Sequence, residues 1–219
     1  ICVDDGSRDD TAHLVDIFRQ SEPRIKLIGL SRNFGKEVAM TAGLDHAKGN
    51  AVVMIDADLE EPPELIGQMV DKWREGFEVV YARRTSRDHD SRFRKMMSRL
   101  FYSTFNKVSD VEIEGGGDFH LLDRRVVDVL VSMRERRRFM KGLFAWAGFK
   151  QTSIPFERAG RAGGSTKWNY WKLWNLGIDF ITGFSTVPLR IWSYLGLVIS
   201  LLAFSYATFI VFRVLVMGR

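Results

Sequence analysis

The chain has 219 residues, of which 46% are hydrophobic and 27% charged, which excludes an intrinsically disordered protein and allows one α/β domain with a sizeable core. A formal net charge of +5 is compatible with an anionic partner, such as a phosphate-bearing substrate, an acidic lipid surface or nucleic acid. The single cysteine, Cys2, excludes an internal disulfide framework, and we expect it to be a small buried residue of a strand.

Strands and helices alternate along the first part of the sequence. Short apolar runs between turn signals predict strands over 1–3, 25–30, 52–55 and 79–82. Apolar residues at helical spacing follow the first three strands, over 14–18, 38–44 and 65–73. This order predicts an α/β fold built from right-handed βαβ units with a mostly parallel sheet. Because a doubly wound sheet normally starts with another strand and helix, we expect further sequence before Ile1.

Polar residues follow each of the first three strands directly. They are Asp4 and Asp5, then Arg32 and Asn33, then Asp56 and Asp58. If the strands are parallel, their carboxyl ends lie along one edge of the sheet, where open α/β sheets bind ligands. Acidic and basic groups that meet at this edge suit a nucleotide, its phosphates and a metal ion.

The carboxylates of Asp56 and Asp58 lie one residue apart at the end of a buried strand. Like charges this close repel unless a cation lies between them, and Mg²⁺ or Mn²⁺ prefers such oxygen ligands. The alternative is a solvated turn with an acidic helix start, because Pro62 and Pro63 are typical of a first helical turn. The two carboxylates alone leave both interpretations open, and the neighbouring polar strand ends favour a metal and diphosphate site.

A basic segment follows the fourth strand. Residues 92–107 have the pattern of a basic amphipathic helix, on which Arg94 and Ser98 share a face. The basic residues of this stretch include Arg83, Arg84, Arg87, Arg92, Arg94, Lys95 and Arg99. A solvated helix face is one explanation, and an anchor for an anionic substrate is the one that we favour.

Three glycines at 115–117 precede Asp118. Glycine allows a ligand to approach the backbone closely, and Asp118 is a candidate general base, although a glycine-rich turn with an acidic residue is common. We expect His120 to form a hydrogen bond rather than bind a metal, because no second histidine lies at ligand spacing.

Three further elements are expected before the C-terminal segment. Residues 139–146 predict an amphipathic helix that packs in the core or lies on a membrane. Pro155 within 154–158 predicts an edge strand, where the missing N–H is tolerated. The basic, glycine-rich residues 161–168 predict a loop that can close over a phosphate.

The C-terminal segment has the composition of a membrane anchor. Aromatic residues over 168–184 are typical of a bilayer interface, and residues 191–212 form an uncharged span of bilayer length. Basic residues before this span, including Arg190, predict that the N-terminal domain faces the cytoplasm. We therefore expect a catalytic domain over 1–166, interfacial helices over 167–190 and a transmembrane helix over 191–217.

Several motifs resemble, in order, those of family 2 glycosyltransferases with a GT-A fold. They are Asp4-Asp5-Gly6-Ser7, Ser31-Arg32-Asn33-Phe34-Gly35-Lys36 and Asp56-Ala57-Asp58-Leu59-Glu60-Glu61-Pro62-Pro63-Glu64. Others resemble the polyprenyl-phosphate branch, which includes dolichol-phosphate mannose synthases and bactoprenol glucosyltransferases. These are Gly117-Asp118-Phe119, Arg138-Phe139-Met140-Lys141-Gly142, Gly164-Ser165-Thr166-Lys167-Trp168 and Ser185-Thr186-Val187-Pro188-Leu189-Arg190. The similarity extends over essentially the whole chain.

The resemblance implies an inverting transfer of a sugar from a nucleoside-diphosphate sugar to a lipid phosphate. The expected donor is UDP-glucose, the expected acceptor is a polyprenyl phosphate such as undecaprenyl phosphate, and the expected cofactor is Mg²⁺ or Mn²⁺. The expected location is the inner membrane, with the catalytic domain on its cytoplasmic side. Members of this branch can self-associate, and the sequence leaves the oligomeric state of this chain open.

The resemblance also implies roles for individual residues. The residues expected to bind the nucleotide sugar are Asp4, Asp5, Arg32, Lys36 and Asp56, and those expected to bind the metal are Asp56, Asp58 and Glu60. The residues expected to bind the acceptor phosphate are Arg84, Arg94 and Ser98. The expected catalytic residues are Asp118 and Asp58. Two residues depart from the family pattern, because Glu60 stands where Gln is common and His120 where Arg is frequent.

Three other functions have to be weighed against this one. A family 2 transferase with a different acceptor, of the polysaccharide type, would usually carry a Gln-x-x-Arg-Trp motif, which the sequence lacks. A non-catalytic, membrane-anchored scaffold would not need Asp56, Asp58 and Asp118. Nucleic-acid binding has only the net charge in its favour, because the sequence contains no recognition motif.

Overall fold

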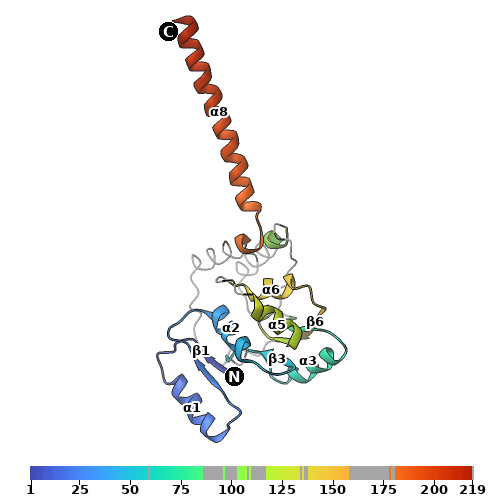
Figure 1. The fold of residues 1–219 in the computed structure, drawn as a ribbon. Helices are drawn as coiled ribbons and strands as arrows, with labels where there is room; N and C mark the ends of the chain where they lie inside the picture. Colours follow the sequence, from blue (N-terminus) through green and yellow to red (C-terminus); the bar gives the residue numbers. More distant parts are fainter. Residues whose placement is uncertain are drawn as a thin grey trace. The chain divides into compact units, whose positions relative to one another are not determined.

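The structure is a computed structural model, and two compact units make up the chain (Figure 1). It describes residues 1–58, 60–85, 96, 103–107, 109, 117–133, 135, 138–157, 178 and 181–218. The first unit comprises Ile1–Ser103 and Val111–Lys167, and the second comprises Thr104–Asp110 and Trp168–Arg219.

The first unit begins with two parallel strands, each followed by a helix. The strands are β1 (Cys2–Asp4) and β2 (Leu27–Gly29), and the helices are α1 (Thr11–Ser21) and α2 (Lys36–His46). Cys2 pairs with Leu27 in the ladder, so the predicted βαβ order is confirmed here. The expectation that Cys2 is buried is wrong, because its side chain is exposed.

A second sheet has four strands in the order β3-β5-β4-β6. They are β3 (Ala51–Met54), β5 (His120–Asp123), β4 (Val79–Arg84) and β6 (Gln151–Phe156). β5 runs antiparallel to both β3 and β4, whereas β4 and β6 are parallel. The α/β class is confirmed, but β3 belongs to the second sheet rather than to the β1–β2 sheet as expected, and its partner there is β5, which we did not predict. β6 lies at the edge of the sheet with Pro155 in it, as predicted.

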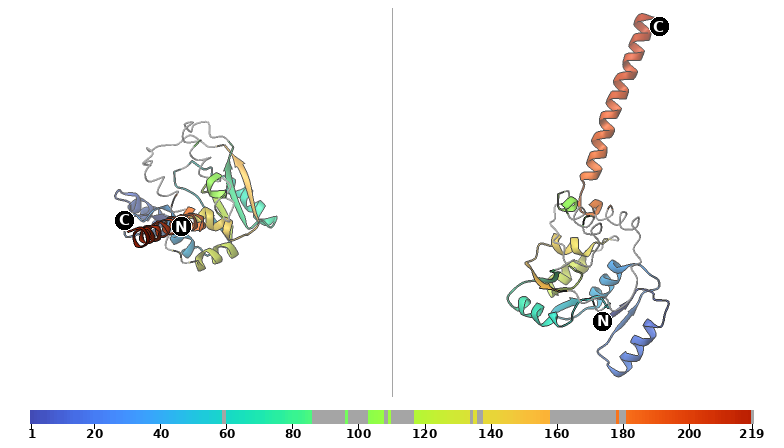
Figure 2. Two further views of the ribbon diagram at one scale, coloured as in Figure 1. Left: turned by 90° about the horizontal axis from the view of Figure 1, so that it is seen from above. Right: turned by 180° about the vertical axis from the view of Figure 1, so that it is seen from behind.

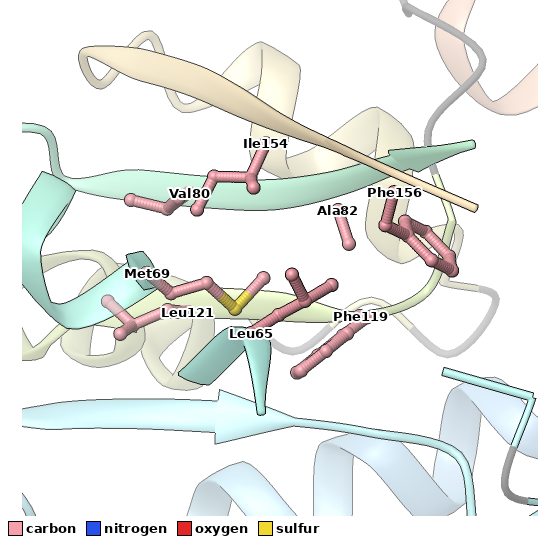
Figure 3. Close-up of a cluster of buried hydrophobic side chains, with 8 residues drawn as sticks. All are labelled: Leu65, Met69, Val80, Ala82, Phe119, Leu121, Ile154 and Phe156. Atoms are coloured by element: carbon pink, nitrogen blue, oxygen red, sulfur yellow. The ribbon is translucent and has the colours of Figure 1, made fainter. Parts of the chain in front are cut away.

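Helix α3 (Leu65–Arg74) covers one face of this sheet (Figures 2 and 3). Its apolar side chains four residues apart, Leu65 and Met69, pack against alternate residues of three strands. The cluster consists of Leu65, Met69, Val80, Ala82, Phe119, Leu121, Ile154 and Phe156. Each large side chain that is fully buried in it stabilises the fold by about 1.5–3 kcal/mol.

The opposite face of the sheet is covered by α5 (Arg124–Ser132) and α6 (Met140–Trp146). The rings of Tyr81 and His120 point to this side, and the His120 ring centroid lies 4.7 Å from that of Phe144 in α6. The sequence left α6 as either a core helix or a membrane-surface helix. Its buried residues, including Met140 and Phe144, show that it is a core helix, although Trp146 is exposed.

The second unit contains the long helix α8 (Val187–Met217). Residues Leu189–Val216 are long and apolar enough to cross a membrane by length and composition, and they are not buried against protein. The helix has Pro in its first turn and ends at Gly218 with φ near +65°. Most of the expected interfacial helix region, 167–190, lies outside the described residues, so its boundaries stay a prediction.

Candidate active site

The loops that follow β1 and β2 are held together by hydrogen bonds. The carboxylate of Asp5 accepts hydrogen bonds from the backbone N–H groups of Phe34 and Gly35, at 2.7 and 2.8 Å. Gly6 has φ near +69°, and an added Cβ would lie 2.5 Å from the backbone carbon of Arg32. Asp5 and Gly6 therefore bring the first two motifs into contact, and β1 and β2 place both at the start of α2.

This contact predicts the effect of replacing Gly6 with alanine. We expect the free energy of unfolding to fall by about 1–3 kcal/mol, because the substitution combines a disfavoured positive φ with a backbone clash. Thermal unfolding of the purified protein measures the change. The matched control is Gly67→Ala in α3, where an added Cβ meets no described atom within 4 Å and alanine improves helix propensity. Equal melting temperatures for the two variants would contradict the role of Gly6.

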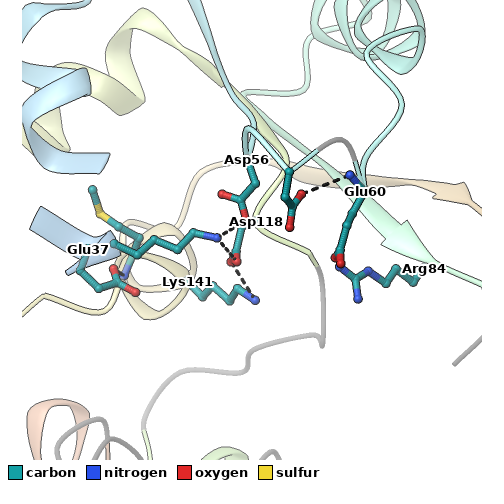
Figure 4. A network of polar contacts seen from close by, with 9 residues as sticks. Glu37, Asp56, Glu60, Arg84, Asp118 and Lys141 are labelled. Atoms are coloured by element: carbon teal, nitrogen blue, oxygen red, sulfur yellow. Dashed lines mark hydrogen bonds and ion pairs between the residues drawn. The ribbon is translucent and has the colours of Figure 1, made fainter. Parts of the chain in front are cut away.

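Lys36, the first residue of α2, joins two carboxylates from other elements, those of Asp56 and Asp118, which are labelled in Figure 4. Its ammonium group donates to Asp56, in the turn after β3, and to Asp118, in the turn before β5. A second ammonium, that of Lys141 in α6, lies 3.0 Å from the other carboxylate oxygen of Asp118. Four elements thus bring two cations and two anions into one cluster, and all four side chains remain partly exposed.

The electrostatics of this cluster keep Asp118 ionised. Burial would raise the pKa of the Asp118 carboxyl, but the ammonium groups of Lys141 and Lys36 outweigh it and hold that pKa well below its usual range. Burial lowers the pKa of Lys36, and Asp118 and Asp56 more than compensate, so the net shift is upward. Asp118 is therefore better suited to hold cationic groups in place than to accept a proton.

Two residues that were predicted to bind different ligands contact each other in the structure. Glu60, expected to bind metal, is buried and forms an ion pair with Arg84, expected to bind the acceptor phosphate, at 3.6 Å. Asp58 accepts a hydrogen bond from the Glu60 backbone N–H at 3.1 Å, which shapes the turn after β3. The structure therefore does not gather Asp56, Asp58 and Glu60, and the described residues contain no group of three His, Cys, Asp or Glu side chains placed to hold a metal.

The residues near Asp56 nevertheless fit a divalent cation. Glu61 is buried, and its Oε2 atom has no hydrogen-bond partner among the described residues. Burial, with Asp56 and Asp118 nearby, raises the pKa of the Glu61 carboxyl. An added cation would offset the repulsion that the neighbouring carboxylates exert on ionised Glu61, and Mg²⁺ or Mn²⁺ takes carboxylate ligands. Asp56 and Asp58 are the partly exposed carboxylates that can supply them.

The glycine before Asp118 serves the protein's own packing. The Gly117 backbone N–H donates to the Ala82 carbonyl at 3.2 Å, and a Cβ on Gly117 would lie 3.1 Å from Glu61 Oε1. Gly117 thus lets this turn lie close to β4 and Glu61, where we had expected close approach to a ligand. Gly115 and Gly116 lie outside the described residues.

His120 forms a hydrogen bond, as expected. Its partner is the Asp118 backbone, which favours the protonated ring, and Nδ1 has no hydrogen-bond partner among the described residues. Burial lowers the pKa of His120 to about 4, so the ring is neutral at physiological pH. The histidine therefore holds the turn that carries Asp118 without adding a charge to it.

The depressed pKa of His120 predicts a loss of stability in acid. An unfolded histidine takes up a proton below about pH 6.5, whereas folded His120 does not until about pH 4, so stability falls as pH decreases through this window. At pH 5 we expect the loss from His120 to be about 2 kcal/mol relative to pH 7.5. His120→Gln should lose less stability over this range. Melting temperatures of both proteins at pH 7.5 and 5 test this, and equal pH dependence would contradict it.

The other predicted residues have separate places. Asp4 accepts hydrogen bonds from the backbone N–H and the hydroxyl of Ser7, and the exposed Arg32 guanidinium lies 4.3 Å from the Phe34 ring centroid. Arg94 and Ser98 lie outside the described residues. Sequence reasoning assigned no role to Glu37 and Lys141, although Lys141 belongs to one of the motifs that carried the resemblance.

Comparisons with known proteins decide the family. Residues 1–130 match the family described as glycosyl transferase family 2. The chain belongs to glycosyl transferase family 2. Its fold is therefore the predicted GT-A class, and the protein is a glycosyltransferase.

Relatives match over the full length of this chain. An uncharacterized glycosyltransferase of Synechocystis is 50% identical over all of this chain and 69% of its own length. A prophage bactoprenol glucosyl transferase homolog of Escherichia coli is 42% identical, over all of this chain and 72% of its own length. The bactoprenol glucosyl transferase of Shigella phage SfV is 41% identical with the same coverage. The chain thus spans about seven-tenths of these relatives.

Solved structures are similar at lower identity. The glucosyl-3-phosphoglycerate synthase of Mycobacterium tuberculosis, in complex with phosphoglyceric acid, is 20% identical, with a TM-score of 0.48 over 82% of this chain and 64% of the other. A mannosyltransferase of Pyrobaculum calidifontis, in complex with GDP-Man and Mn²⁺, is 18% identical, with a TM-score of 0.48 over 80% of this chain and 50% of the other.

Proposed function

We propose that this glycosyltransferase transfers a sugar from a nucleoside-diphosphate sugar to a polyprenyl phosphate. The observation that carries the proposal is the 40–42% identity, over the whole chain, to proteins named as bactoprenol glucosyl transferases or their homolog. Glucose is accordingly the proposed sugar, UDP the proposed nucleotide, and undecaprenyl phosphate the proposed acceptor. The reaction is proposed to invert the anomeric centre.

The donor is proposed to lie over the ends of β1, β2 and β3. Asp4, Asp5 and Arg32 would contact the nucleoside side of the donor, and Lys36 its phosphates. Asp56 and Asp58 would hold Mg²⁺ or Mn²⁺, which when bound neutralises charge on the leaving diphosphate. The loop contacts made by Asp5 and Gly6 support this proposal, because they fix the first two motifs beside each other before any substrate binds.

The acceptor needs positioning more than deprotonation. A phosphate monoester is anionic at neutral pH, so the attacking oxygen already carries negative charge. The low pKa of Asp118 makes it a weak base, which supports a role in orienting charged groups at the reaction centre. Arg84, Arg94 and Ser98 are the proposed acceptor-phosphate ligands, and release of Arg84 from Glu60 would make its guanidinium available.

Helix α8 supports a membrane location for the reaction. A helix that can span a bilayer would keep the protein beside an acceptor whose prenyl tail lies in lipid. We place the catalytic domain on the cytoplasmic side of the inner membrane, since Arg190 and other basic residues precede the span. The proposed domains are the catalytic region 1–166, the interfacial region 167–190 and the membrane helix 191–217.

The test uses membranes that contain the full chain, undecaprenyl phosphate, MnCl₂ or MgCl₂, and a panel of labelled nucleotide sugars. We expect label from UDP-glucose to enter the organic phase, and EDTA to abolish the transfer. Label from another donor would correct the sugar and keep the acceptor. No label from any donor, with the protein shown to be folded and inserted, would overturn the proposed acceptor.

A further inference from the structure

Lys141 reaches the active-site cluster from α6, and the proposed reaction assigns no role to its side chain. Its ammonium lies 3.0 Å from Asp118 Oδ1, and its side chain is 21% exposed, so a ligand at the cluster can contact it. Lys36 contacts the other oxygen of the same carboxylate. Asp118 therefore holds two ammonium groups next to each other (Figure 4).

Helix formation does not explain either lysine. Lys36 is the first residue of α2 and Lys141 the second of α6, and a helix start carries partial positive charge that disfavours cations. The Lys141–Asp118 contact alone is a weak reason for stability, because partly exposed ion pairs contribute about 0–1 kcal/mol. The placement of two ammonium groups at one carboxylate is therefore better explained by a ligand than by folding.

The residues around Lys141 act together to present it. The Arg138 guanidinium donates to the carbonyls of Met133 and Leu130, at 2.9 and 2.8 Å, at the end of α5. The Glu37 carboxylate accepts the Met140 backbone N–H at 2.8 Å, so the residue next to Lys36 holds the residue next to Lys141. The Arg138 contacts hold the start of α6 at α5, and the Glu37 contact holds it at α2, which sets the spacing of the two lysines.

Two adjacent ammonium groups suit a doubly charged oxyanion. A phosphate monoester carries a charge of about −1.5 to −2 at neutral pH, and the two linked phosphates of a nucleotide sugar together carry about −2. Both offer several acceptor oxygens, and lysine is a common phosphate ligand. Both substrates of the proposed reaction carry phosphate. Resting on that proposed function, we propose that Lys141 and Lys36 together bind a phosphate group of a substrate, and that Asp118 keeps both ammonium groups in position for it.

The experiment compares Lys141→Met, Lys141→Arg and the wild-type full chain in two arms. The first arm measures binding of UDP-glucose with MnCl₂ by calorimetry, and the second measures the KM for undecaprenyl phosphate. We expect Lys141→Met either to weaken the binding of UDP-glucose or to raise the KM for undecaprenyl phosphate, by at least about 10-fold, and Lys141→Arg to restore the wild-type value. The quantity that changes identifies which phosphate is bound. The control Lys72→Met removes an equal charge from an exposed pair on α3 and should change neither arm.

Values within twofold of wild type in both arms for Lys141→Met would overturn the inference and leave the proposed function intact. Absence of binding and transfer in the wild type would instead overturn the proposed function. A second measurement needs no substitution: acetylation of Lys141 in the wild-type protein, followed by mass spectrometry with and without each substrate. Protection by one substrate is expected, and equal labelling with and without both would also overturn the inference.

Discussion

Asp118→Asn is expected to lower kcat at least about 100-fold while the protein stays folded. The substitution keeps the size of the side chain and removes the charge that holds Lys36 and Lys141 together. Without it the two ammonium groups repel and lose the spacing that the proposed phosphate site requires. The KM for the substrate whose phosphate the two lysines bind should rise as well, because that site has lost the carboxylate that positions them. Steady-state kinetics with varied acceptor measure both constants.

The pH dependence distinguishes this role from that of a base whose pKa lies near neutral pH. Because the pKa of Asp118 lies well below its usual range, the carboxylate does not change its charge between pH 5 and 9. Its ionisation should therefore produce no limb in the pH profile of kcat over that range. The control Asp71→Asn alters a surface pair with Arg74 on α3 and should leave kcat unchanged. A kcat of Asp118→Asn within twofold of wild type would contradict the assignment.

Asp58→Asn is expected to lower kcat/KM at least about 100-fold at a fixed metal concentration and to weaken binding of Mn²⁺. Asparagine keeps the side-chain oxygen that accepts the Glu60 N–H, so the turn after β3 should persist. The lost charge is then the main change at the site. Binding of Mn²⁺ in the presence of UDP, followed by electron paramagnetic resonance, gives a measurement that does not depend on turnover.

Glu60→Gln separates the two roles that Glu60 can have. If Glu60 is mainly the partner of Arg84, the neutral variant should bind Mn²⁺ nearly as well as the wild type and change the use of the acceptor. If Glu60 is instead a metal ligand, Glu60→Gln should weaken the binding of Mn²⁺ to a degree similar to Asp58→Asn.

Retention of full activity and of Mn²⁺ affinity in Asp58→Asn would contradict the proposed metal role of Asp58.

Much of the local structure follows from the sequence. The helices α1, α2 and α3 and the strands β1 to β4 lie where apolar periodicity placed them. Helix α3 and strand β4 bury their apolar residues, whereas most apolar residues of α1 are exposed. The ordered motifs predicted the family correctly, since they keep acids, glycines and lysines at fixed distances along the chain. The long apolar run likewise predicted α8, because bilayer thickness sets the length of such a helix.

Pairing between distant segments could not be predicted from the sequence in the same way. Only four residues form β5, and their pattern is too short to predict a strand or to say that it lies between β3 and β4. The contacts of Asp118 with Lys36 and Lys141 join residues that are 82 and 23 positions away from it. Glu37 likewise contacts Met140 across 103 positions.

The sequence by itself determined the family, the order of most helices and strands, and the residue types available for chemistry. Local spacing carries that information, since it reflects helical and strand periods and motifs along one segment. The tertiary structure alone decided that Asp118 holds two lysines, that Glu60 lies against Arg84, and that Glu37 fixes the start of α6. These are electrostatic contacts between segments that are far apart in the sequence. Their strength depends on the distance between the charges and on their burial, and neither follows from residue spacing along the chain.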